Sequence, residues 1–196
     1  MEKKLIKYTV SVYTEDSVGL LNRISAIFQK RHINIESFNS SMTEIENVQR
    51  WTILVITSES LIKKIVGQIN KQIEVIQAYY HTDEETIYQE SCLFKIKSSL
   101  LFDDRKIQNI IKESNAIIVT VNPEFFVIEK SGRTHELDDL YEKLNKYGIL
   151  QYVRSARIAV TKAPLMISEI LTDLSLIHIS EPTRRRGISY AVFCLK

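Results

Sequence analysis

The chain has 196 residues, of which 44% are hydrophobic and 26% are charged, and its formal net charge is +2 at pH 7. This composition is ordinary for a folded globular protein and disfavours intrinsic disorder. No apolar run reaches about 18 residues, and the polar start Met1-Glu2-Lys3-Lys4 lacks the core of a signal peptide, so we expect a cytoplasmic protein without a membrane-spanning helix.

The first 81 residues predict one βαββαβ unit. Apolar and polar residues alternate at its start, which is the period of a half-buried strand, and apolar residues then recur at helical spacing. The expected elements are a strand at 6–13, a helix at 18–31, strands at 34–42 and 50–57, a helix whose residues Leu61, Ile65 and Ile69 face one way, and a strand at 73–80.

Residues 82–90 are polar and acidic and are interpreted as a linker, after which residues 91–165 repeat the same order of elements. This second set comprises a strand at 91–98, a helix at 103–113, strands at 116–122 and 125–130, a helix at 136–146 and a strand at 150–160. Two consecutive βαββαβ units favour an α+β fold of two tandem ferredoxin-like domains, each an antiparallel sheet with two helices on one face.

The end of the chain has a different character. Residues 166–173 are expected to be a truncated native segment, and residues 174–196 resemble the translation of a widely used transposase-based sequencing adapter. The alternative is a native basic tail. Without residues 174–196, four basic residues and one acidic residue leave the count, so the formal net charge changes from +2 to −1. No basic cluster then remains in the sequence, and neither nucleic acid nor an anionic membrane is expected as a partner.

The turn Asp16-Ser17-Val18-Gly19, between the first strand and the first helix, is the strongest candidate for a binding site. Backbone N–H groups at the start of a helix lack partners inside it and, with the helix dipole, attract a small anion such as a carboxylate. The turn therefore suggests a sensor of amino acids. The alternative is that Ser17 caps an ordinary helix and Gly19 only allows that helix to pack close to the sheet.

Catalytic and metal-binding motifs receive little support. The sequence has no GxSxG, GxGxxG or phosphate-loop motif, and Cys92 and Cys194 lack metal or redox spacing. Cys92 is expected to be a small buried hydrophobic residue. An RNA-binding domain of similar topology is disfavoured, because the strand at 50–57 lacks the glycines and the second aromatic residue of such a domain.

The predicted sheets also bear on the oligomeric state. A four-stranded open sheet has exposed edges, which proteins cover or pair. Side-by-side pairing of two such sheets would cover an edge of each. We therefore expect a homodimer.

The segment DSVGLLNRISAIFQKRHINIES, residues 16–37, resembles the signature of ACT domains. Residues 4–165 as a whole resemble the small, regulatory subunits of acetolactate (acetohydroxyacid) synthase. The tetrapeptide Asn34-Ile35-Glu36-Ser37, the strand that starts Arg50-Trp51-Thr52-Ile53, and a second domain of this length separate that family from other ACT proteins. The resemblance implies an ACT domain at 1–81 and a C-terminal ferredoxin-like domain at 91–165.

The function implied by this resemblance is regulatory. Members of the family have no active site; they bind the catalytic large subunit, raise its activity and confer feedback inhibition by branched-chain amino acids, commonly valine, at the interface of paired ACT domains. The resemblance thus places the chain in isoleucine, valine and leucine biosynthesis, as a homodimer formed through ACT domains. Thiamine diphosphate, Mg²⁺ and FAD are expected on the catalytic subunit only, with no cofactor bound by this chain.

The resemblance assigns the valine site to Asp16, Ser17, Val18, Gly19, Leu20, Asn34 and Ile35. It implies that Gly19 and Leu20 present backbone amides to the valine carboxylate, with Asp16 at the mouth of the turn. Asn34 and Ile35 would come from the neighbouring protomer. Some family members have Asn in place of Asp16, and a carboxylate there repels the ligand carboxylate but attracts its ammonium group.

A second hypothesis is a stand-alone ACT-domain sensor that regulates another pathway or transcription. The sequence shows neither a DNA-binding helix pair nor a basic surface, which favours the regulatory subunit. Co-purification with a thiamine-diphosphate-dependent synthase would separate the two hypotheses.

Overall fold

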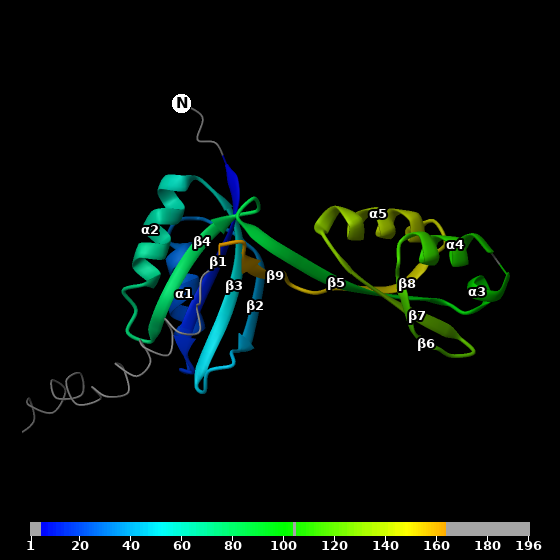
Figure 1. Ribbon diagram of the computed structural model, residues 1–196, viewed down its shortest axis with the longest axis horizontal. Coiled ribbons are helices and arrows are strands. Elements are labelled where there is room, and N and C mark those ends of the chain that lie inside the picture. Colours follow the sequence, from blue (N-terminus) through cyan, green and yellow to red (C-terminus); the bar gives the residue numbers. More distant parts are fainter. Residues whose placement is uncertain (1–4, 104, 164–196) are drawn as a thin grey trace, which may run out of the picture. The chain divides into compact units, whose positions relative to one another are not determined.

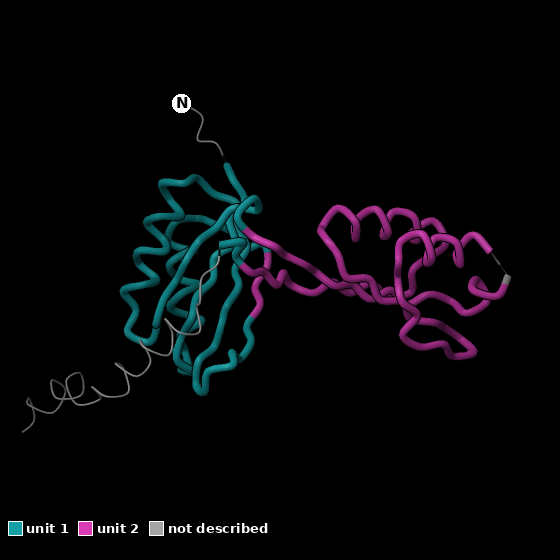
Figure 2. Tube along the Cα trace, viewed as in Figure 1, with its two compact units in different colours: residues 1–36, 40–85, 161–196 teal, residues 37–39, 86–160 magenta. Residues whose placement is uncertain are grey.

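The computed structural model describes residues 5–103 and 105–163 (Figure 1). These residues divide into two compact units, one with residues 5–36, 40–85 and 161–163 and one with residues 37–39 and 86–160 (Figure 2). The expected native segment at 166–173 and the expected adapter translation at 174–196 lie outside the described residues.

The first unit is built on a four-stranded sheet with two helices. Its elements are β1 (Ile6–Glu15), α1 (Leu20–Gln29), β2 (Ile35–Met42, apart from residues 37–39), β3 (Val48–Thr57), α2 (Glu59–Ile69) and β4 (Val75–Thr82). The strand order is β2-β3-β1-β4, and β1 runs antiparallel to both β3 and β4. Both helices lie on the same side of this sheet (Figure 1).

Buried apolar side chains hold the two helices of the first unit in place. The buried residues are Leu20, Ile24, Ile27 and Phe28 in α1, and Ile62, Ile65, Val66 and Ile69 in α2. In the sheet, Val10 is paired with Ile53, and both are fully buried. Burial of each such side chain contributes about 1.5–3 kcal/mol. The start of α1, and with it the turn after β1, is therefore firmly anchored.

The second unit repeats this topology. Its elements are β5 (Thr86–Lys97), α3 (Ser99–Asp103), α4 (Arg105–Glu113), β6 (Ile117–Val121), β7 (Phe125–Gly132), α5 (Thr134–Asn145), β8 (Ile149–Arg154) and β9 (Ile158–Thr161). The strand order is β6-β7-β5-β8, and β9 also pairs with β5. Because both sheets have the same order, the predicted α+β fold of two tandem ferredoxin-like domains is confirmed.

One difference from the sequence-based expectation concerns residues 82–90. Thr82 ends β4, residues 83–85 form a turn, and residues 86–90 already belong to β5. The Glu85 carboxylate fixes the turn, because it accepts hydrogen bonds from the Thr82 backbone N–H at 2.8 Å and from the Thr82 hydroxyl at 3.0 Å. Local polarity indicated a loop here, whereas strand pairing determines the conformation.

A second difference lies at the last predicted strand, 150–160, which is divided into β8 and β9 by residues 155–157. Arg157, just before β9, is buried. Its guanidinium carbon lies 3.6 Å from the centre of the Tyr88 ring, and its Nε lies 3.5 Å from Glu90 Oε1. An arginine is rarely buried without such partners. The alternating sequence pattern does not reveal this inward side chain, so the break between the strands was not predicted.

Candidate functional site

The turn between β1 and α1 is held by backbone hydrogen bonds to two other segments of the first unit. The Glu15 N–H donates to the carbonyl of Glu74 at 2.9 Å, and the Asp16 N–H donates to the carbonyl of Asn47 at 3.2 Å. Asn47 directly precedes β3, and Glu74 directly precedes β4. The strands next to β1 in the sheet therefore determine where the turn lies.

Gly19 allows the chain to turn from β1 into α1. It is the N-cap residue of α1, and its φ of 85° lies in the left-handed region that residues with side chains rarely adopt. A Cβ atom built on Gly19 would meet no described atom within 4 Å outside Gly19 and its two chain neighbours. Glycine is thus required by the backbone conformation, and the space beside it is open to a ligand.

Ser17 does not cap the helix. In the described turn no side chain makes a capping hydrogen bond to α1, and Ser17 instead uses its carbonyl, which accepts from the Leu20 N–H at 3.5 Å. The N–H groups of Val18 and Gly19 have no hydrogen-bond partner among the described residues. Because these amides lie at the positive end of a helix dipole, they can bind a carboxylate.

Asp16 is exposed at the mouth of the turn, and its carboxylate is oriented by β3. It accepts a hydrogen bond from Gln49 Nε2 at 2.8 Å, and Gln49 Oε1 accepts one from Trp51 Nε1 at 3.1 Å. The negative charge of Asp16 is available to a cation such as an ammonium group. Sequence reasoning identified Asp16 but missed Gln49, because the two residues are brought together by strand pairing and no local pattern indicates it.

The other predicted residues are not gathered in one chain. Leu20 is fully buried and anchors the first turn of α1, whereas Asn34 and Ile35 follow the opposite end of that helix. A helix of 10 residues is about 15 Å long. A site that contains both Gly19 and Asn34 would therefore need two copies of the chain.

An ion pair beside the turn was also missed by sequence reasoning. Arg23, one helical turn after Gly19, donates to the Glu74 carboxylate at 2.6 Å, and this hydrogen bond holds the pKa of Glu74 below its ordinary value. The Arg23 N–H donates to the Gly19 carbonyl at 3.4 Å. The pair links the start of α1 to the residue before β4. Its members are separated by 51 residues, so no local pattern predicts it.

Cys92, which the sequence predicts to be a small buried hydrophobic residue, is buried. Its Sγ donates to the carbonyl of Lys130 at 3.3 Å, and burial raises its pKa to about 11, so the thiol is protonated at neutral pH. Within residues 5–103 and 105–163, no three His, Cys, Asp or Glu side chains are grouped so that they could hold a metal ion. Over the same residues, no helix is long and apolar enough to cross a membrane.

Comparisons with known proteins cover both units. Residues 10–77 match the family model of the AHAS small subunit-like ACT domain, and residues 89–163 match that of the small subunit of acetolactate synthase. The acetolactate synthase small subunit of Mycobacterium bovis is 31% identical over 160 residues, which cover 80% of this chain and 93% of the relative. That of Bacillus subtilis is 30% identical over 158 residues, which cover 80% and 92%.

The fold is similar to the crystal structure of the acetolactate synthase small subunit from Thermotoga maritima. The TM-score is 0.72, and the match covers 81% of this chain and 99% of that chain. The sequences are 20% identical, so this likeness concerns the fold.

Proposed function

Because the chain belongs to the family of acetolactate synthase small subunits, we propose that it is a regulatory subunit that activates the catalytic large subunit and confers feedback inhibition by valine. The observation that carries the effector part of this proposal is the β1–α1 turn. It combines two N–H groups that have no hydrogen-bond partner among the described residues, open space beside Gly19 and an exposed carboxylate on Asp16. An α-amino acid has the complementary groups.

The groups of the turn suggest how valine would bind. Its carboxylate would accept hydrogen bonds from the Val18 and Gly19 N–H groups, and its ammonium group would lie toward Asp16. Hydrogen bonds to charged groups contribute about 1.5–3 kcal/mol each. The Leu20 N–H is a weaker candidate donor, because it is directed at the Ser17 carbonyl at 3.5 Å.

A homodimer through the ACT domains would complete this site. In one protomer, Asn34 and Ile35 follow the end of α1 that is opposite to the Gly19 turn, about 15 Å along the helix. We therefore assign them to the site of a second copy. β2, which starts at Ile35, lies at one edge of the sheet, and proteins commonly cover or pair such edges. Side-by-side pairing of two sheets would use such an edge.

Catalysis in this proposal belongs to the large subunit in the cytoplasm. The large subunit would hold thiamine diphosphate, Mg²⁺ and FAD, and this chain would bind none of them. This chain would act through its contact with the large subunit. Valine bound at the turn would change how that contact affects the rate of acetolactate formation.

The proposal is tested by co-expression of the full chain with a thiamine-diphosphate-dependent synthase subunit encoded in the same genome. We expect the two proteins to co-purify, and we expect acetolactate formation to be faster than with the catalytic subunit alone. Failure to form a complex, together with an unchanged rate, would contradict the proposal and favour a stand-alone amino-acid sensor.

A further inference from the structure

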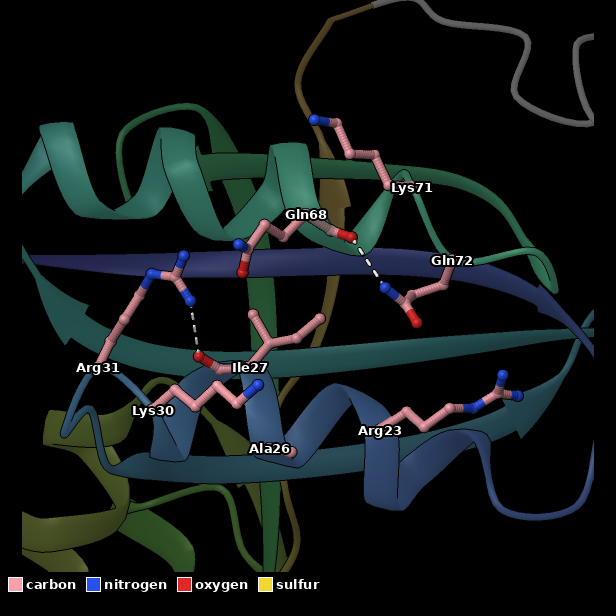
Figure 3. A pocket seen from close by; sticks show the side chains of 8 residues that line it. All are labelled: Arg23, Ala26, Ile27, Lys30, Arg31, Gln68, Lys71 and Gln72. Carbon is pink, nitrogen blue, oxygen red and sulfur yellow. Dashed lines mark hydrogen bonds between the residues drawn. The ribbon is translucent and has the colours of Figure 1, made fainter.

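A groove of about 710 Å³ lies between α1 and the end of α2 and has a strongly basic lining (Figure 3). Four cationic side chains, Arg23, Lys30, Arg31 and Lys71, line it together with the amides of Gln68 and Gln72. No carboxylate lines it among the described residues. The sequence showed no basic cluster outside residues 174–196, because these four residues are gathered only when α1 packs beside α2.

Lys30 and Lys71 are the two cations of the lining whose side chains make no hydrogen bond or ion pair with the described residues, and Arg31 also keeps its positive charge, because a carbonyl does not neutralise a guanidinium. Arg23 is engaged with Glu74 at 2.6 Å, and Arg31 donates to the Ile27 carbonyl at 3.1 Å. Lys30 and Lys71 are exposed, and within the described part of the chain neither has an ion-pair partner. Two uncompensated ammonium groups in a groove without carboxylates attract an anionic partner.

The spacing of the cations indicates what kind of anion fits. Arg23 and Arg31 lie near opposite ends of the groove, with Lys30 between them (Figure 3). Arg23 lies inside α1 and Arg31 lies two residues beyond its end at Gln29, and the six helical residues from Arg23 to Gln29 alone correspond to about 9 Å. The positive charge is therefore spread along the groove instead of converging on one point. Such a row complements a protein segment with several carboxylates better than it complements a single phosphate group.

We propose that this α1/α2 groove is the docking site for an acidic segment of the catalytic large subunit. The proposal rests on the proposed function, since it names the surface through which the regulatory contact is made. The groove begins at Arg23, whose N–H donates to the Gly19 carbonyl at 3.4 Å. The docked segment would thus touch the same helix that starts at the effector turn, one helical turn away from it.

The experiment compares two charge-reversed full-length chains. Lys30→Glu/Lys71→Glu changes two exposed lysines of the groove, and Lys112→Glu/Lys143→Glu changes two exposed lysines of the second unit by the same charge. The control is matched in position, because Lys112 and Lys143 also lie at helix C-terminal ends, where cations interact with the dipole. The pair Lys30→Gln/Lys71→Gln removes the two charges without reversing them, and serves as a second test variant in case the reversed pair does not fold.

Affinity for the catalytic subunit is measured by calorimetry at low and at high salt. We expect the groove reversal to weaken binding by about tenfold or more and to reduce its salt dependence, with a smaller loss for the glutamine pair. The control should bind within about twofold of wild type, since it leaves the groove intact. Valine binding by the groove variant alone should be retained.

Several results would overturn the docking site. One is equal affinity of wild type and groove variants for the catalytic subunit, and another is the same loss in the control. A third is wild-type binding of inorganic triphosphate that disappears in Lys30→Glu/Lys71→Glu while binding to the catalytic subunit is unchanged, since the groove would then serve a small anion. If the wild-type chain does not bind the catalytic subunit, both the proposed function and the docking site fail. If the wild-type chain binds, the comparison of variants tests the docking site alone.

Discussion

At the scale of single residues, the β1–α1 turn was predictable in part. Asp16, Ser17 and Gly19 were identified from the sequence, because a turn that opens a helix has a local signature of glycine and small polar residues. The residues that hold the turn, Gln49 and Glu74, have no such signature. They reach it through sheet pairing and an ion pair across long stretches of sequence.

The valine site predicts the effect of a side chain at Gly19. In Gly19→Asp, the new carboxylate would lie beside the N–H groups assigned to the ligand carboxylate, and we expect the affinity for valine to fall by about tenfold or more through charge repulsion. Isothermal titration of valine into the full chain measures this affinity.

Gly148→Asp is the matched control for that titration. Gly148 has a φ of 84°, its Cβ position is equally open, and it lies in the second unit, so both variants carry the same backbone strain. Retained affinity in Gly148→Asp is expected. Equal affinities of Gly19→Asp and wild type for valine would refute the site.

The burial of Cys92 predicts low reactivity. Since its pKa is raised to about 11, the thiolate is scarce at pH 8, and we expect alkylation in the native Cys194→Ser chain to be slower by about 100-fold or more than in denaturant. A thiol titration under both conditions gives the two rates. A native rate close to that of the unfolded chain would show that Cys92 is accessible.

At the scale of elements, the sequence predicted the order of the strands and of the longer helices but missed the short helix α3 and the break between β8 and β9. It also placed the buried face of α2 incorrectly. The spacing of Leu61, Ile65 and Ile69 by four residues suggested one inward stripe, whereas the structure buries Ile62, Ile65, Val66 and Ile69. Positions four apart drift around a helix with 3.6 residues per turn, and alternating steps of three and four follow one face. Leu61 is accordingly half-buried beside that face.

The face of α2 is tested by two alanine substitutions. Ile62→Ala should lower the free energy of unfolding by about 2–5 kcal/mol, because it removes a fully buried side chain and leaves a cavity. Leu61→Ala should cost about 1 kcal/mol. Urea unfolding followed by the fluorescence of Trp51, the single tryptophan and a buried residue of β3, reports on this unit. A larger loss for Leu61→Ala would mean that α2 is rotated.

The strands of the second unit show a different limit of sequence reasoning. The alternating pattern of the sequence predicted one continuous strand at 150–160. That pattern alone could not indicate that Arg157 is buried against Tyr88 and Glu90. A charged residue is placed on the exposed face by default. Only the tertiary contacts reveal the exception, and with it the break between β8 and β9.

At the scale of the whole molecule, the order of the elements was sufficient to predict the fold. Two βαββαβ sets lead to two sheets with the same strand order, because βαβ units of this length have few compact arrangements. What the order of elements did not indicate is the α1/α2 groove, since one of its four cations lies in α1 and the other three lie in the segments that follow α1 and α2.

The proposed site requires two copies of the chain, so the oligomeric state is a direct prediction. Analytical ultracentrifugation of the full chain at micromolar concentration should show a dimer. A monomer alone at that concentration would leave Asn34 and Ile35 without a site to complete and would contradict the assignment of these residues.

The central claim is that valine at the β1–α1 turn controls an active site on another chain. Its most direct test is a valine titration of acetolactate formation by the complex, with the wild-type chain and with Gly19→Asp in parallel. We predict that valine lowers the rate of the wild-type complex and that the Gly19→Asp complex stays active over the same range. A wild-type complex that valine does not inhibit, or identical inhibition curves for the two complexes, would contradict the claim.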